Sequence, residues 1–175
     1  MPLVKAGRVI EDRFVRVLDD APLPEHVPVL LPAGRLLADI GDLARREAPL
    51  GVIWPNDRRV SELAPHLDCL AMVALQFPKF RDGRAYSQAR QLRERFGFRG
   101  ELRATGQILR DQFLFLLRAG FDAFEVVKEA DAQNFAEATR RYSVFYQPTA
   151  DGRPTALALR SRHRASASKV VETVR

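Results

Sequence analysis

The sequence predicts an α/β fold of repeated βα units around a mainly parallel sheet. Short apolar runs alternate with amphipathic stretches through the middle of the chain, and parallel neighbours need a helix-length return between them. With 175 residues, 46% of them hydrophobic, the chain is long enough to bury one core. Two arrangements fit the repeats: a compact or partial TIM-like barrel, which the strict order of the units favours, and an open doubly wound sheet.

Apolar runs predict the strands, and amphipathic stretches predict the helices between them. A short run at residues 13–17 precedes the repeats and predicts an edge strand. The strands of the repeats are expected at residues 27–31, 50–54, 70–77, 101–104, 123–126 and 143–146. The helices are expected at residues 35–46, 59–67, 84–96, 107–119 and 131–141.

Glycine ends the predicted helices 84–96 and 107–119. Gly97 and Gly120 are each followed by an aromatic residue, Phe98 or Phe121. Glycine adopts the left-handed conformation that closes a helix, and the aromatic residue after it can pack back onto the protein. The βα unit is therefore expected to repeat in form.

Residues with side-chain oxygens precede the same two helices. Asp82 comes before the first and Thr105 before the second, so each is expected to be an N-cap. The helix at 107–119 also carries Leu114 and Phe115 outside its main apolar stripe. Such a helix is either enclosed within the fold or covered by a second subunit, and we expect enclosure.

The composition changes after Tyr146. The residues that follow contain strand-breaking proline and glycine, then the basic run 160–164 and a stretch rich in alanine and serine. We therefore expect a single domain over residues 1–146 and a flexible basic tail over residues 147–175. Such a tail can bind nucleic acid, but a charged terminus is more often solvated, so nucleic-acid binding is not the expectation.

The chain is basic and uses arginine far more than lysine. Its 28 basic and 22 acidic residues give a net charge of +6 and a sequence pI of about 10.1, which favours anionic partners. The planar arginine side chain holds carboxylate, sulfate or phosphate groups with two hydrogen bonds. Genome composition can also produce an arginine bias. The positions of the arginines in the fold therefore decide whether they indicate a binding site.

Several classes of site are not expected. Cys69 is the only cysteine, which excludes a disulfide framework, and its apolar neighbours predict a packed thiol. His26, His66 and His163 are too widely spaced to indicate a metal site or a histidine base. Phosphate-binding glycine loops and the nucleophile elbow are missing. With no apolar segment of signal-peptide or membrane-span length, we expect a cytoplasmic protein.

Polar residues gather in the loops that follow two neighbouring strands. Carboxyl ends of parallel strands meet at one edge of a sheet, where ligand sites form. The first loop and its helix supply Arg81, Gly83, Arg84 and Ser87, and the second supply Arg103, Thr105, Gly106 and Arg110. Glycine, helix-start N–H groups and arginine forks together suit an anion. The alternative is that nearby acidic residues neutralise these arginines in ordinary surface ion pairs.

Acidic and aromatic residues at the same edge are the candidates for chemistry. Asp82 and Asp111 could act as acid or base, although carboxylates at helix starts are usually caps. Trp54, Asp57 and Glu125 lie at the ends of further strands and could complete a pocket. The absence of known catalytic motifs weakens an enzyme interpretation without excluding it.

Motifs across the same region resemble a bacterial family, the domain of unknown function 934. The matching segments are residues 82–93, 100–106, 111–112 and 120–124, and the resemblance extends to about Tyr146. Members of this family are encoded beside assimilatory sulfite reductase and phosphoadenylyl-sulfate reductase, and some carry an oxidoreductase label. The resemblance implies a role in sulfur assimilation but supplies neither catalytic residues nor a cofactor.

Three functions are compatible with these features. The first is an accessory protein of cytoplasmic sulfate or sulfite reduction that binds a small anion, or an acidic partner such as sulfite reductase, through the arginine-rich edge. The second is an oxidoreductase or another enzyme of that pathway acting on a small anionic substrate. The third is nucleic-acid binding through the basic tail. The cofactor remains open, and neither a metal nor a membrane partner is expected.

Overall fold

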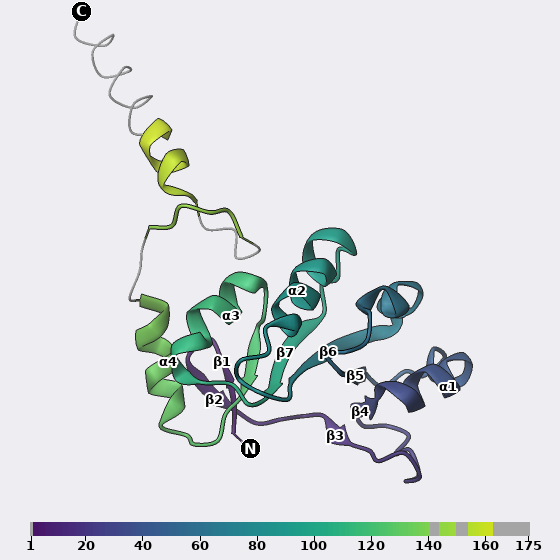
Figure 1. Cartoon of the computed structure of the whole chain (residues 1–175). Helices are drawn as coiled ribbons and strands as arrows, with labels where there is room; N and C mark the ends of the chain where they lie inside the picture. The colour runs from purple at the N-terminus through teal and green to yellow at the C-terminus, as the bar shows by residue number, and fades with distance from the viewer. Residues whose placement is uncertain (1, 141–143, 150–153, 163–175) are drawn as a thin grey trace, which may run out of the picture.

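The computed structural model describes residues 2–140, 144–149 and 154–162. Its fold is mixed α/β, with eight strands in one curled sheet that forms a half-barrel, in the order β2-β1-β8-β7-β6-β5-β4-β3 (Figure 1). The strands are β1 (Leu3–Lys5), β2 (Arg8–Ile10), β3 (Val15–Arg16), β4 (Val29–Pro32), β5 (Leu50–Trp54), β6 (Leu70–Phe77), β7 (Glu101–Gly106) and β8 (Ala123–Glu125).

Helices alternate with the strands from β4 onward, and Figure 1 shows α1, α2 and α3 along one face of the sheet. The helices are α1 (Ala33–Leu43), the 3₁₀ helix η1 (Val60–Cys69), α2 (Arg84–Arg90), the π-helical turn η2 (Gln91–Arg95), the 3₁₀ turn η3 (Arg110–Gln112), α3 (Phe113–Ala119) and α4 (Asp131–Arg140). Among the described residues, no helix is long and apolar enough to cross a membrane.

The predicted fold class is confirmed in its barrel-like form. From β3 to β8, strands that follow one another in the chain are also parallel neighbours in the sheet. A doubly wound sheet reverses its strand order at a switch point, and this part of the sheet has no such reversal. The half-barrel therefore follows from the unbroken order of the βα units.

An amino-terminal hairpin that the sequence analysis did not predict extends the sheet. Strand β1 pairs antiparallel with β8 on one side and with β2 on the other. The hairpin turns at Ala6 and Gly7, whose φ angles are 51° and 71°, as the favoured two-residue hairpin turn requires. The sequence signal for this hairpin was a glycine between two short runs that contain branched apolar side chains. Strands of three residues are too short to show the alternation that predicts a strand.

The chain between β2 and β3 joins the two edges of the sheet. Only residues 11–14 separate Ile10 from Val15, so those two Cα atoms lie at most about 18 Å apart. Phe14 in this connection packs on the concave face against Leu30 and Met72. The half-barrel is thus lined on its concave side by its own amino-terminal segment.

Close packing under Phe14 depends on a glycine. A Cβ atom at Gly51 would lie 3.1 Å from Met72 Cε, 3.2 Å from Leu30 Cδ1 and 3.3 Å from Phe14 Cε1. These separations are tighter than ordinary van der Waals contact. The larger apolar core lies on the other face of the sheet, where Trp54, Phe77 and Leu102 are fully buried beneath the helices.

Most element predictions are confirmed, although one predicted helix differs in type. The glycines at both helix ends are left-handed, with φ angles of 66° at Gly97 and 104° at Gly120, and the aromatic residues after them are buried. The predicted helix at 59–67 is a 3₁₀ helix that contains Pro65. Proline removes a backbone donor, which disfavours α-helical geometry within a helix.

The helix predicted over residues 107–119 is shorter than expected. Strand β7 continues to Gly106, and α3 begins only at Phe113. The N-cap prediction for Thr105 is therefore wrong, because this residue lies inside a strand. On α3, Leu114 is buried as expected, but Phe115 is 64% exposed, so enclosure covers only part of the extra apolar surface.

The end of the chain is described only in part. Of the strand predicted at 143–146, Ser143 lies outside the described residues, and the rest carries one isolated bridge between Phe145 and Thr155. Residues 156–162 are helical and project away from the half-barrel (Figure 1). The expectation of a flexible tail from residue 147 stays a prediction.

Candidate functional site

Arg103 lies on the concave face of the half-barrel, where its side chain is only 2% exposed. Its Nη1 and Nη2 atoms donate to Asp12 at 2.7 and 3.0 Å. Its Nε donates to Glu101 Oε1 at 3.0 Å, and Nη1 lies 3.4 Å from Glu125 Oε1. Arg103 is thus surrounded by carboxylates of this chain.

Glu125 connects the same network to the opposite edge of the sheet. Both of its carboxylate oxygens lie 2.5 Å from Arg16 Nη2, and its Oε2 accepts a hydrogen bond from Thr105 Oγ1. Lys5 pairs with Glu101 at 3.0 Å. These residues, which we call the concave-face network, are Lys5, Asp12, Arg16, Glu101, Arg103, Thr105 and Glu125. The three cations of this network balance its three carboxylates. Because its contacts join the amino-terminal segment to β7 and β8, the network fastens that segment across the half-barrel.

This geometry corrects the prediction for Arg103 and Thr105. Both lie within β7 and are occupied by side chains of the same chain, so they do not form a loop that receives an anion. Burial lowers the pKa of Arg103, but its hydrogen bonds and charge interactions with Asp12 and Glu101 outweigh this, and the pKa ends above its usual value. Arg103 therefore remains a cation inside the network.

Acid should weaken the contact between Asp12 and Arg103. Partial burial raises the pKa of Asp12, but hydrogen bonds from Arg103 and the Phe14 N–H, with the nearby arginine charges, lower it below its usual value. A carboxyl whose pKa is lower in the folded state stabilises above its unfolded pKa, about 3.9, and loses this contribution as the pH falls below it. In urea denaturation series, the stability difference between wild type and Asp12→Asn should be largest at pH 7 and shrink towards pH 3. A constant difference would contradict this role.

The loop after β6 holds the first group of predicted site residues at the surface. Arg84 pairs with Asp82, its Nη2 lying 2.6 Å from Oδ2, and Arg81 lies over the Phe80 ring with Cζ 5.3 Å from the centroid. Gly83 is the N-cap of α2, one residue later than predicted, although Asp82 Oδ1 accepts the Arg84 N–H at 3.3 Å. Arg84 is thus paired within its own loop.

Ionisation of Asp82 follows from that pair. The hydrogen bond from Arg84 is the main cause that holds the pKa of Asp82 far below its usual range, although slight desolvation acts against it. A carboxylate with so low a pKa is a weak base at neutral pH and carries no proton to donate. Asp111 is exposed in η3, and Ser87 is exposed on α2.

The loops after β6 and β7 lie against each other, as the sequence predicted. Gln112 Nε2 donates to the Phe80 carbonyl at 2.9 Å, and the Gln107 N–H donates to the Phe77 carbonyl at 2.7 Å. Gly106 makes this approach possible because its φ is 96° and a Cβ there would lie 2.5 Å from the Phe77 oxygen. The predicted site residues of the two loops therefore share one edge.

Exposed cations and apolar side chains gather on these joined loops. Lys79, Arg81 and Arg110 are exposed, and within the described part of the chain no carboxylate lies at ion-pair distance from them. Phe80 and Leu109 beside them are 41% and 44% exposed. We call these five residues the basic edge. Of the predicted site residues it keeps only Arg81 and Arg110, and it gains Lys79 and two apolar residues.

Of the residues predicted to complete a pocket, several have structural roles. Trp54 is fully buried and lies beneath the Arg58 guanidinium, 5.0 Å from Cζ to the ring centroid. Asp57 is exposed in the following loop. Asn56 is buried there, and its side chain is among the groups that lower the pKa of Asp82. Glu125, on the concave face, lies apart from this loop and belongs to the network with Arg103.

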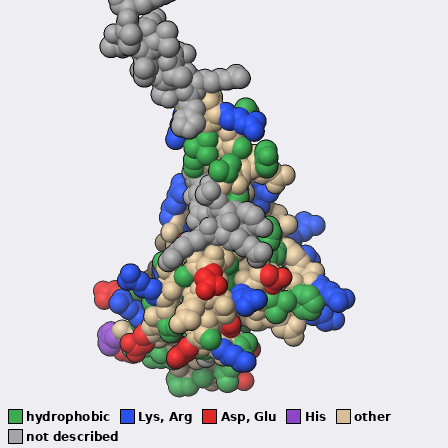
Figure 2. Space-filling view, turned by 90° about the vertical axis from the view of Figure 1, so that its left-hand side faces the viewer, with side chains coloured by type: hydrophobic (Ala, Val, Ile, Leu, Met, Phe, Trp, Pro, Cys, Tyr) green, Lys and Arg blue, Asp and Glu red, His purple; other side chains and the backbone are tan. Residues whose placement is uncertain are grey.

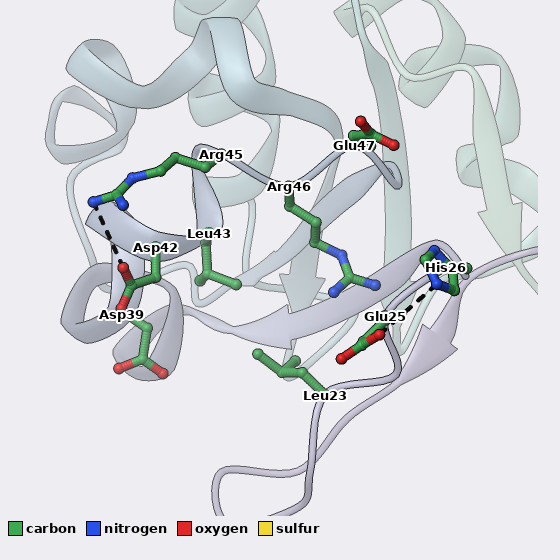
Figure 3. Close-up of a pocket in the computed structure, with 9 residues that line it drawn as sticks. All are labelled: Leu23, Glu25, His26, Asp39, Asp42, Leu43, Arg45, Arg46 and Glu47. Carbon is green, nitrogen blue, oxygen red and sulfur yellow. Dashed lines mark ion pairs between the residues drawn. The ribbon is translucent and has the colours of Figure 1, made fainter.

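A cavity of about 460 Å³ lies near the amino-terminal end of β4, the opposite edge from the predicted site. Figure 3 shows the Arg46 side chain between Leu43 and the loop that carries Glu25 and His26. Arg46 Nη2 donates to the carbonyls of Pro24 and Val27, which holds that loop against α1. Arg46, which lines this cavity, therefore has a structural role.

Neither a metal site nor a reactive thiol is indicated. Within residues 2–140, 144–149 and 154–162, no group of three or more metal-ligating side chains gathers. Burial raises the pKa of the Cys69 thiol, which disfavours the nucleophilic thiolate. On the side of the molecule at the left of Figure 1, acidic and basic side chains are interspersed (Figure 2), so the net positive charge is not concentrated there.

The fold and the basic edge define a half-barrel α/β protein with exposed cations at the carboxyl ends of its strands. A family model described as a bacterial protein of unknown function (DUF934) matches residues 51–157, which is more than half of the chain. The chain belongs to this family, as its motifs indicated. No curated protein and no solved structure matches it.

Proposed function

We propose that this protein is an accessory component of cytoplasmic sulfate or sulfite reduction that docks on an acidic protein surface through the basic edge. The pathway rests on the resemblance of its motifs to a family encoded beside sulfur-assimilation enzymes. The mode of binding rests on the arrangement of Lys79, Arg81 and Arg110 around Phe80 and Leu109. The partner proposed is sulfite reductase or another enzyme of the same pathway.

The single observation that supports docking is the composition of the basic edge. Arginine and aromatic residues are enriched where protein interfaces derive their binding energy. Cations without a carboxylate neighbour at ion-pair distance among the described residues attract an acidic surface over a long range and accelerate its association. The exposed Phe80 and Leu109 then add apolar contact once the surfaces meet.

A protein partner fits this edge better than a small anion does. The buried guanidinium that could have closed around an anion, Arg103, is occupied by three carboxylates. Arg84 is held by Asp82. The remaining cations stand on exposed loops, where a small anion would stay largely hydrated. Of the two acid–base candidates of the enzyme alternative, Asp82 is tied to Arg84, and Asp111 is exposed in η3.

Association with the partner and growth on sulfate test the proposal. Purified protein titrated onto purified sulfite reductase should give saturable binding that weakens steeply with added salt. Deletion of the gene in its native host should slow growth with sulfate as the sole sulfur source and leave growth on cysteine normal. Absence of binding at low salt, together with normal growth on sulfate, would refute the proposal.

A further inference from the structure

Gln112, in the 3₁₀ turn η3, joins the two loops of the basic edge through both ends of its side-chain amide. Its Nε2 donates to the Phe80 carbonyl at 2.9 Å, and its Oε1 accepts the Leu109 N–H, also at 2.9 Å. Phe80 belongs to the loop after β6, and Leu109 belongs to the loop after β7. One side chain therefore holds together the two backbone segments that carry the apolar residues of the basic edge.

The turn that carries Phe80 leaves its carbonyl available to Gln112. The Asp82 N–H donates to the Lys79 carbonyl at 3.0 Å, which closes a β-turn. Phe80 and Arg81 are the two central residues of this turn, and the closing bond does not use the Phe80 carbonyl. Because the Arg81 guanidinium lies over the Phe80 ring, the bond from Gln112 restrains Arg81 as well.

The amide oxygen of Gln112 restrains the second loop. Leu109 is the N-cap of η3, and Gln112 is the third residue after it. A glutamine at this position accepts the N–H of the N-cap residue, as in a capping box. The Gln112 N–H in turn donates to the Leu109 carbonyl at 3.0 Å, so both backbone polar groups of Leu109 are bonded to one residue. Arg110 follows directly in the chain, and its position depends on the same contacts.

The two contacts of Gln112 require a donor and an acceptor on one side chain. The Leu109 N–H must face an acceptor and the Phe80 carbonyl must face a donor, which fixes the orientation of the amide. Glutamate has the same length and keeps the acceptor, but its carboxylate cannot donate. Methionine has a similar length and has neither a strong donor nor a strong acceptor. Substitution by these two residues therefore separates the contact with Leu109 from the contact with Phe80.

We propose that Gln112 is a positioning residue of the basic edge, which it holds in the arrangement that docks on the acidic partner. The docking part of this inference rests on the proposed function. A surface that is ordered before binding loses less conformational entropy when its partner arrives. Gln112 acts through the residues that it restrains, directly or through a neighbour, which are Phe80, Arg81, Leu109 and Arg110.

Amide hydrogen exchange of the full-length protein, followed by nuclear magnetic resonance, tests the positioning without a partner. In Gln112→Met the Leu109 N–H loses its acceptor and should exchange at least about threefold faster than in wild type. In Gln112→Glu the acceptor remains, so the Leu109 N–H should exchange at nearly the wild-type rate. Near-ultraviolet circular dichroism of both variants verifies that they are folded. Exchange that is unchanged in both variants, or equally accelerated in both, would overturn the positioning role.

Binding to purified sulfite reductase tests the consequence for docking. Gln112→Met should bind at least about tenfold more weakly than wild type, while the salt dependence of the affinity stays the same because the cations of the basic edge are unchanged. The matched control is Gln91→Met, the same change at an exposed glutamine of η2, which should alter the affinity less than about twofold.

Equal losses of affinity in Gln112→Met and Gln91→Met, or a wild-type affinity in Gln112→Met, would overturn the role of Gln112 in docking. Failure of the wild-type protein to bind sulfite reductase would instead refute the proposed function. The exchange rates of the Leu109 N–H then decide by themselves whether Gln112 positions the two loops.

Discussion

Replacing Arg103 with leucine should lower the free energy of unfolding by about 3–5 kcal/mol, the usual cost of removing one partner from a buried charge network. The substitution leaves the carboxylates of Asp12, Glu101 and Glu125 without their shared cation. Glu125 suffers most because its side chain is only 4% exposed, although Arg16 still pairs with it. The loss should be read from urea denaturation at pH 7.

Lys5→Ala is the matched control for Arg103→Leu. Lys5 pairs with the same Glu101, but its side chain is 46% exposed, so its removal should cost less than about 1 kcal/mol. If Arg103→Leu costs no more than Lys5→Ala, the concave-face network does not fasten the amino-terminal segment. A cost several times larger supports the network as the element that fastens the amino-terminal segment across the half-barrel.

Gly106→Ala should cost about 2–4 kcal/mol, because two penalties act at one position. An alanine at a φ of 96° adopts a backbone conformation that is unfavourable by about 1–3 kcal/mol. Its Cβ would also lie 2.5 Å from the Phe77 carbonyl oxygen. The backbone must move apart to relieve this contact, which breaks the hydrogen bond from Gln107 to the same oxygen, now 2.7 Å long.

Gly83→Ala, in the neighbouring loop, is the control for this substitution. The φ angle at Gly83 is −82°, and a Cβ there would meet Tyr86 Cδ2 at 3.9 Å, an ordinary contact. Its stability should change by less than about 1 kcal/mol. Thermal and urea denaturation of both variants measure the contrast. Equal effects would show that the junction of the two loops does not depend on the left-handed glycine.

Local signals in the sequence were sufficient for the repeated βα units, but not for the amino-terminal hairpin. The runs at 50–54 and 70–77 were predicted with the bounds that β5 and β6 have. The left-handed glycines at 97 and 120 were recognisable because glycine stood directly before an aromatic residue. These features depend on neighbours within a few residues, and such neighbours can be identified from sequence alone.

The carboxylate partners of Arg103 could not be predicted from neighbouring residues in the sequence. Its alternation with Leu102 and Ala104 places it on the opposite face of β7 from those two residues, which was the available signal. Whether that face holds a ligand or a carboxylate depends on Asp12, which lies 91 residues earlier in the chain. A buried ion pair over such a separation leaves no local pattern.

The shared edge of the two loops was predictable, but its composition was not. Parallel strands bring Arg81 and Arg110 to one edge whatever the details of the turns. The pairing of Arg84 with Asp82 and the exposure of Phe80 follow from side-chain conformations within the loop. Sequence therefore located the basic edge and overestimated the number of arginines available to a partner.

Charge reversal of the basic edge in the double variant Arg81→Glu/Arg110→Glu examines the docking surface itself. The control is Arg95→Glu/Arg99→Glu, which makes the same change of net charge on exposed residues near the amino-terminal end of β7. Binding to purified sulfite reductase at low salt should weaken at least about 100-fold in the first variant and less than about threefold in the second. Equal losses in the two variants, or none in either, would contradict docking through the basic edge.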